Sequence, residues 1–147
     1  MPEDHTALVV DDVPANREFL ERLLATAKFN VTGVASGKAA LQAIQDVDDL
    51  TMAMVDMKLP DMHGLEVTLA LRKRFPTALI VIATMYDAFS LMEEAFGKGC
   101  NVFLVKPHGF MELYKRLTST DMGEMRKTQR LVIDQYGPRE FKGTAAK

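Results

Sequence analysis

Residues 7–28, ALVVDDVPANREFLERLLATAK, decide the fold class of this 147-residue chain. The stretch begins with a short unbroken apolar run, which is typical of a strand buried on both faces. Asp11 and Asp12 follow, and an amphipathic segment then begins at Pro14, a residue that suits the first turn of a helix. The stretch therefore predicts a buried strand, an acidic loop and a helix.

The same strand-and-helix unit recurs four more times along the chain. The further short apolar runs lie at residues 31–34, 52–55, 79–83 and 102–105. The amphipathic segments that follow them lie at residues 37–47, 65–75, 88–98 and 109–117, and Ser36 suits the N-cap of the first. Such alternation predicts parallel strands joined by right-handed helical crossovers. We therefore expect an α/β three-layer sandwich, with helices on both faces of a five-stranded parallel sheet.

The composition excludes several classes of protein. Hydrophobic residues make up 48% of the chain and charged residues 26%, a balance that predicts a packed globular core. The net charge of −2 gives no electrostatic reason to expect direct binding of nucleic acid. No apolar run approaches the roughly 20 residues of a membrane helix, so no membrane insertion is expected. The single cysteine, Cys100, favours a reduced, cytoplasmic location.

Residues 119–147 lie beyond the repeated pattern. Their apolar residues would share one face of a helix over 121–136, which Gly137 and Pro138 would end. We expect a frayed tail after that helix. The expected organisation is therefore one domain over residues 1–118 and a C-terminal extension over 119–147, which is too short for a typical DNA-binding or enzymatic output domain.

Polar residues occur directly after the predicted strands, where a buried run gives way to a loop. They are Asp11 and Asp12 after the first strand, Asp56 after the third, Thr84 after the fourth and Lys106 after the fifth. The carboxyl ends of parallel strands share one edge of a sheet, so these side chains should converge. Carboxylates that lie close together repel one another, and Mg²⁺, which prefers oxygen ligands, relieves the repulsion. A carboxylate beside such a metal can also attack a phosphoryl group.

Four motifs resemble the receiver domain of two-component response regulators. They are LVVDD at 8–12, VDMKLPDMHG at 55–64, IAT at 82–84 and FLVKP at 103–107. Each motif alone is weak, but their order and spacing together are specific, and the resemblance covers about residues 6–118. It implies a flavodoxin-like fold with five helices and strand order 2-1-3-4-5.

The resemblance also implies roles for individual residues. Asp56 corresponds to the phospho-acceptor, and Thr84 and Lys106 to the hydroxyl and the ammonium that act on the phosphoryl group. Thr84 and Phe103 occupy the positions of the conformational switch. The bond between Lys106 and Pro107 is expected to be cis.

The implied metal is Mg²⁺, and no other cofactor is expected. Its ligands would be the carboxylates of Asp11, Asp12 and Asp56 and the backbone carbonyl of Lys58. Met57, Lys58 and Tyr86 flank the predicted site and are expected to influence the lifetime of the phosphoryl group.

The implied function is that of a chemotaxis-type single-domain regulator in a phosphorelay. A histidine kinase or a histidine phosphotransfer protein would donate the phosphoryl group, and a downstream protein would bind the altered surface. The chain would not be an enzyme beyond Mg²⁺-dependent self-phosphorylation and autodephosphorylation. A homodimer through the fourth helix, fifth strand and fifth helix, or through the C-terminal helix, is left open.

Other interpretations of the same residues remain. Asp12 alone could cap the first helix, and Phe103 alone could be a core residue. The chain as a whole could be a phosphorylation-independent, receiver-like interaction module, although the intact set of acids argues against this. A flavin-binding electron carrier is disfavoured because the acids of DDVPAN would repel an FMN phosphate. A phosphatase of the haloacid-dehalogenase type is disfavoured because no DxD motif follows the first strand.

Overall fold

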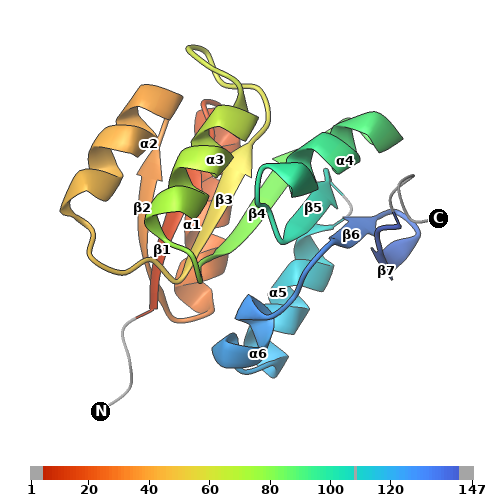
Figure 1. The fold of residues 1–147 in the computed structure, drawn as a ribbon. Helices are drawn as coiled ribbons and strands as arrows, with labels where there is room; N and C mark the ends of the chain where they lie inside the picture. Colours follow the sequence, from red (N-terminus) through yellow and green to blue (C-terminus); the bar gives the residue numbers. More distant parts are fainter. Residues whose placement is uncertain (1–4, 108, 143–147) are drawn as a thin grey trace.

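The computed structural model describes residues 5–107 and 109–142, and it contains all five predicted strand-and-helix units. In chain order these are β1 (His5–Val10), α1 (Pro14–Thr26), β2 (Phe29–Val34), α2 (Gly37–Ala43) with the 3-10 turn η1 (Ile44–Asp46), β3 (Met52–Asp56), α3 (Gly64–Arg74), β4 (Leu79–Thr84), α4 (Phe89–Gly97), β5 (Val102–Val105) and α5 (Phe110–Ser119). Three further elements follow, α6 (Met122–Arg126), β6 (Leu131–Asp134) and β7 (Gly137–Glu140) (Figure 1).

The strands form one sheet in the order β2-β1-β3-β4-β5-β6-β7. The predicted order of the first five strands and their parallel pairing are confirmed, and the fold is flavodoxin-like. Strand order reverses between β1 and β3, so the crevice at their carboxyl ends is where folds of this kind place a ligand site.

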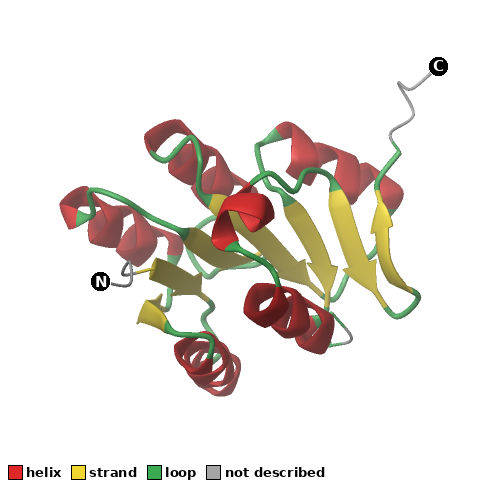
Figure 2. Ribbon diagram, turned by 90° about the horizontal axis from the view of Figure 1, so that it is seen from below, coloured by secondary structure: helices red, strands yellow, loops and turns green. Residues whose placement is uncertain are grey.

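Helices cover both faces of the sheet (Figure 2). Buried residues of α2, α3 and α4 belong to one apolar cluster, and those of α1, α5 and α6 belong to the other. Successive strand residues alternate between the clusters, so that Val10 faces the first and Val9 the second. Burial on both faces explains why the strands are unbroken apolar runs. None of the helices in the described residues is long and apolar enough to cross a bilayer.

Local features of the predicted units are also confirmed. Pro14 is at the start of α1, and the Ser36 side chain accepts a hydrogen bond from the Ala39 N–H at 3.1 Å to cap α2. The peptide bond between Lys106 and Pro107 is cis.

The predicted helix over residues 121–136 is wrong beyond Arg126. Residues 131–140 instead form a hairpin in which β6 pairs in parallel with β5 and β7 pairs antiparallel with β6. β6 satisfies the outer backbone groups of β5, which would otherwise be a free sheet edge. The strand also buries Val132 in one apolar cluster and Ile133 in the other, whereas successive residues of a helix do not point to opposite sides.

The predicted frayed tail is wrong over residues 139–142, and residues 143–147 lie outside the described part of the chain. Phe141 is only 6% exposed, and its ring centroid lies 4.9 Å from that of Phe89 and 5.1 Å from that of Phe96. The C-terminal hairpin, β6 and β7 with Phe141, therefore covers the edge of β5 and part of α4. The predicted alternative of a homodimer through a C-terminal helix over residues 121–136 therefore has no structural basis, because residues 131–140 form strands.

Candidate functional site

Three carboxylates meet at the carboxyl ends of β1 and β3. One carboxylate oxygen each from Asp11, Asp12 and Asp56 lies within 4.8 Å of the others. Asp11 is buried, Asp56 is partly buried and Asp12 is exposed, so the cluster opens to solvent on one side. The predicted convergence of these acids is confirmed. Their oxygens form a donor set suited to a hard divalent cation such as Mg²⁺.

Lys106 completes the cluster from the loop after β5. Its Nζ lies 3.4 Å from Asp11 Oδ2 and 3.6 Å from Asp56 Oδ2, and its side chain is 12% exposed. The Lys106 N–H donates to the carbonyl of Thr84 at 2.7 Å, which fixes the start of the loop against β4. One ammonium thus faces three carboxylates, and a surplus of negative charge remains.

The pKa of Asp56 reflects first its burial and then the charges around it. Burial raises the pKa of the Asp56 carboxyl above its ordinary value, and the ammonium of Lys106 opposes that rise. Asp11 raises the pKa further, the Lys58 N–H lowers it, and Asp12 adds a small rise. The net direction is upward, so ionisation of Asp56 costs more than in a free side chain, and a bound cation would offset that cost.

Asp11 and Asp12 are held differently. Asp11 Oδ1 accepts from the Val13 N–H at 3.0 Å, and Arg17 Nη1 donates to the Asp11 carbonyl at 2.9 Å. The N-cap of α1 is Val13, without a side-chain cap, so the alternative in which Asp12 caps this helix is wrong. Asp12 makes no hydrogen bond or ion pair with the described residues. Its carboxylate is therefore free to act as a ligand.

Thr84 ends β4 beside the acids and is 3% exposed. Asp56 pairs with Ala83 in the sheet, so Thr84 is one residue further toward the site. Its Oγ1 accepts a hydrogen bond from the Tyr86 N–H at 3.2 Å. The hydroxyl therefore lies at the predicted edge of the sheet, where it accepts a hydrogen bond from the loop that follows β4.

The loop after Asp56 folds back onto the backbone of that residue. The Gly64 N–H donates to the Met57 carbonyl at 2.7 Å, and a Cβ built on Gly64 would lie 2.2 Å from the Asp56 carbonyl oxygen. Only glycine fits this close approach without movement of the backbone. At the rim of the same loop, Lys58 Nζ donates to the Tyr86 hydroxyl at 3.0 Å, and this bond raises the pKa of Lys58.

Two residues that support this loop were missed from the sequence. Asp61 accepts from the Gly37 and Lys38 N–H groups at 2.9 and 2.8 Å, and these bonds lower the pKa of Asp61. His63 caps α3 through Nδ1, which accepts from the Leu65 N–H at 3.3 Å, with Glu66 closing a capping box. The spacing of His63 and Glu66 could have indicated the second feature. Asp61 bonds to the start of α2, which is far from it in the sequence, so no local sequence pattern indicates this contact.

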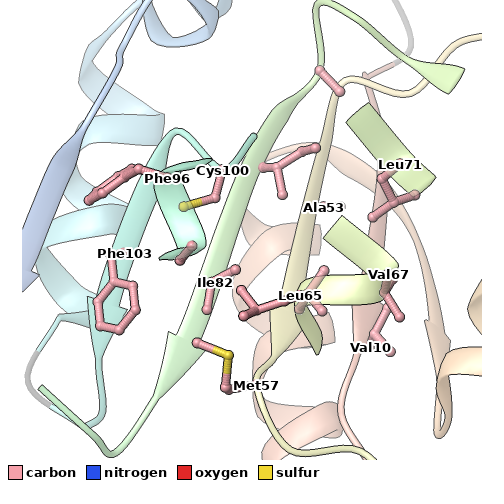
Figure 3. Packing of buried hydrophobic residues seen from close by; sticks show 14 of the residues in the cluster. Val10, Ala53, Met57, Leu65, Val67, Leu71, Ile82, Phe96, Cys100 and Phe103 are labelled. Atoms are coloured by element: carbon pink, nitrogen blue, oxygen red, sulfur yellow. The ribbon is translucent and has the colours of Figure 1, made fainter. Parts of the chain in front are cut away.

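Phe103 is fully buried in the apolar cluster beneath α4 (Figure 3). Its ring centroid lies 6.5 Å from that of Phe96, and in the sheet it pairs with Ile82 on one side and Val132 on the other. The position predicted for the switch is therefore enclosed by the C-terminal hairpin.

Comparison with known sequences gives a consistent result. Residues 7–118 match the response regulator receiver domain. A cyclic di-GMP phosphodiesterase of Thermotoga maritima is 29% identical over 113 residues, which cover 77% of this chain and 30% of that protein. Response regulator protein PilR of Pseudomonas aeruginosa is 31% identical over 101 residues, which cover 69% of this chain and 22% of PilR. The chain thus spans less than a third of the length of either relative.

Solved structures share the fold. A CheY-like receiver domain protein of Methanospirillum hungatei superposes with a TM-score of 0.74 at 23% identity, covering 85% of this chain and 98% of that one. The chemotaxis protein CheY4 of Vibrio cholerae has a TM-score of 0.71 at 26% identity, covering 78% of this chain and 97% of that one.

Proposed function

Because the chain belongs to the response regulator receiver family of two-component signalling, we propose that it accepts a phosphoryl group on Asp56. The observation that carries the proposal is the placement of Asp56 within 4.8 Å of two further carboxylates and 3.6 Å from Lys106 Nζ. The donor would be the phosphohistidine of a histidine kinase or of a phosphotransfer protein.

The chemistry is an in-line transfer between two nucleophiles. A carboxylate oxygen of Asp56 forms a bond to phosphorus, the bond from phosphorus to the histidine nitrogen breaks, and the imidazole leaves with that electron pair. Asp11, Asp12, Asp56 and the Lys58 carbonyl would hold Mg²⁺, which when bound neutralises charge on the phosphoryl oxygens. Lys106, already beside Asp56, pairs with the new phosphoryl group.

The proposed response begins at Thr84. To donate its hydroxyl hydrogen to the phosphoryl group, Thr84 turns toward Asp56, and the loop between β4 and α4, whose Tyr86 N–H bonds to this hydroxyl, moves with it. This loop leads directly into Phe89, which packs on Phe141 of the C-terminal hairpin. The surface that changes in this proposal is therefore α4 together with the hairpin, and Phe103 beneath them adjusts to the movement.

The output in this proposal is protein contact in the cytoplasm, as in a chemotaxis-type single-domain regulator. The net charge of −2 supports a protein partner over DNA. The proposal includes no catalytic activity beyond Mg²⁺-dependent phosphorylation and dephosphorylation of Asp56.

The test is labelling with a small phosphodonor such as radioactive acetyl phosphate in the presence of Mg²⁺. Asp56→Asn should abolish labelling, whereas Asp48→Asn, a change at an exposed acid outside the acidic cluster and its loops, should retain it. Labelling of Asp56→Asn at the wild-type level would refute the assignment. Absence of labelling and of any Mg²⁺ response in the wild-type protein would favour a phosphorylation-independent interaction module.

A further inference from the structure

A second charged site lies at the opposite end of the sheet, before the amino ends of β4, β5 and β6. A surface pocket of about 380 Å³ opens there between the end of α3, the loop after α4 and the segment that joins α6 to β6. Arg72, Arg126 and Arg130 line it together with Asn101, Gln129 and Phe96. In Figure 1, α6 lies at the lower end of the molecule, away from the arrowheads of β2 and β3. We call this cavity the arginine pocket.

Arg72 forms a rigid wall of the arginine pocket. Its guanidinium donates to the carbonyl of Gly99 at 2.9 Å, to the carbonyl of Pro76 at 2.8 Å and to Asn101 Oδ1 at 2.6 Å. All of these acceptors are neutral. Partial burial lowers the pKa of Arg72 because the charge loses solvent, and no carboxylate in the described part of the chain forms an ion pair with it.

Arg126 and Arg130 have unused hydrogen-bonding capacity. Arg126 Nε is buried without a hydrogen-bond partner, which is costly for a charged donor. Arg130 lies over the rings of Phe96 and Phe141, 5.5 and 5.2 Å from their centroids, and in the described residues its guanidinium makes no hydrogen bond. The aromatic rings hold Arg130 at the mouth of the pocket while its N–H groups stay available.

The charges of the arginine pocket are not balanced by any acid among residues 5–107 and 109–142. No Asp or Glu of this part of the chain lines the pocket, and none of its five ion pairs includes the pocket's arginines. Cys100, which also lines it, is neutral because burial raises the pKa of its thiol. Three guanidinium groups around one partly enclosed space repel one another, and an anion would relieve that repulsion.

We propose that the arginine pocket binds a small molecule that carries a diphosphate group. Planar guanidinium groups match phosphate oxygens with paired hydrogen bonds, and the terminal N–H groups of Arg126 and Arg130 have no partner among the described residues. A diphosphate ester carries about three negative charges near neutral pH, which equals the charge of the three arginines. The cavity volume lies near the lower end of the range for small-molecule sites and suits a compact ligand.

The test is a titration of the full, metal-free chain with inorganic pyrophosphate, followed by NMR of the arginine Nε–H signals. Saturable shifts of Arg72, Arg126 and Arg130 are expected. Arg126→Gln should weaken binding by about tenfold, the loss expected for one hydrogen bond between charged groups. The matched control is Lys127→Gln, which removes one charge from an exposed neighbour outside the pocket and should change affinity by less than about twofold.

Thermal melting checks that Arg126→Gln is folded, and Arg130→Gln, at an exposed position, serves as a second variant. Absence of saturable shifts up to about 10 mM pyrophosphate, or shifts confined to the residues near Lys106, would overturn the proposal. Wild-type affinity in both arginine variants would also overturn it. Binding of a hexaglutamate peptide in place of pyrophosphate would instead identify the pocket as a docking site for an acidic protein segment, and the proposal would be wrong.

Discussion

The two ends of the sheet carry opposite charges, and they are built from different parts of the chain. At the carboxyl end, Asp11, Asp12 and Asp56 face the single ammonium of Lys106. At the amino end, the arginine pocket has no described acid. The acidic end consists entirely of residues from the five repeated units, whereas Arg126 and Arg130 come from the segment after α5. The C-terminal extension therefore adds a second charged end as well as two strands.

The two ends also differ in how they connect to the hydrophobic core. The acids are at the tips of strands, where the sheet itself fixes their positions. The arginine pocket depends on Phe96 and Phe141, which stack on one another and support Arg130. The same Phe96 lies beside Phe103, so α4 and β5 form the physical link between the ends.

The largest expected effect comes from Gly64→Ala, which should damage the acidic end alone. The added Cβ meets the Asp56 carbonyl oxygen at 2.2 Å, so the backbone around the acid must shift. We expect a loss of about 3 kcal/mol in the free energy of unfolding and much weaker Mg²⁺ binding. Urea denaturation and Mg²⁺ titration measure these changes, and pyrophosphate binding at the other end should be unaffected.

Gly97→Ala is the matched control for this change. A Cβ at Gly97, at the end of α4, meets nothing within 4 Å, so the variant should be as stable as the wild type or slightly more stable. Equal stability of the two alanine variants would show that the loop after Asp56 is not held in the position described.

The next effect, Phe141→Ala, should weaken the basic end. It removes a buried ring from Phe89 and Phe96 and takes away one support of Arg130, at an expected cost of about 3 kcal/mol. Hydrogen exchange of the amides of β6 and β7 should accelerate. Tyr136→Ala, at an 83% exposed side chain, should change stability by less than about 0.5 kcal/mol. Unchanged exchange in Phe141→Ala would mean that the hairpin does not depend on this ring.

The acidic end could be predicted from the sequence because its signals are local. Strands buried on both faces must be unbroken apolar runs, and Asp11 or Asp56 at the end of such a run has only one sheet edge on which to lie. The strand order 2-1-3-4-5 was implied only by the resemblance to the receiver family, because right-handed crossovers fix the side of the sheet on which each helix lies but not the order of the strands.

The C-terminal hairpin could not be predicted in the same way. The run Leu131–Asp134 has four residues, too few for its periodicity to separate a strand from part of a helix. Gly137, with φ of 94°, lies at the turn of the hairpin, but in the sequence a glycine before a proline equally indicates the end of a helix. The arginine pocket depends on that hairpin and on contacts between distant segments, so no local pattern could indicate it.

A smaller effect is expected for Asp56→Asn in metal-free protein. Since the pKa of Asp56 is raised by folding, protonation favours the folded state, and this contribution is lost as pH rises from the ordinary value of 3.8 through the raised value. At pH 7 the asparagine variant should therefore be more stable than the wild type, by about 1 kcal/mol or about 3 °C in Tm. The difference should shrink as pH falls toward about 4. Thermal melts at several pH values measure it, with Asp48→Asn as an exposed control. A variant less stable than the wild type at pH 7 would contradict a raised pKa for the buried Asp56 carboxyl.

The smallest effect tests whether the two ends communicate. If phosphorylation of Asp56 moves Thr84 and the loop to Phe89, the stack of Phe89, Phe141 and Phe96 loosens, and Arg130 loses part of its support. Pyrophosphate should then bind the phosphorylated chain about threefold more weakly, a coupling of about 0.6 kcal/mol. The measurement uses protein phosphorylated in Mg²⁺ and then stripped of metal with EDTA, with unphosphorylated protein treated identically. Linkage requires the reciprocal effect, so pyrophosphate must disfavour the phosphorylated conformation by the same factor. Equal affinities in the two states would show that the ends act independently, even though one helix and one strand join them.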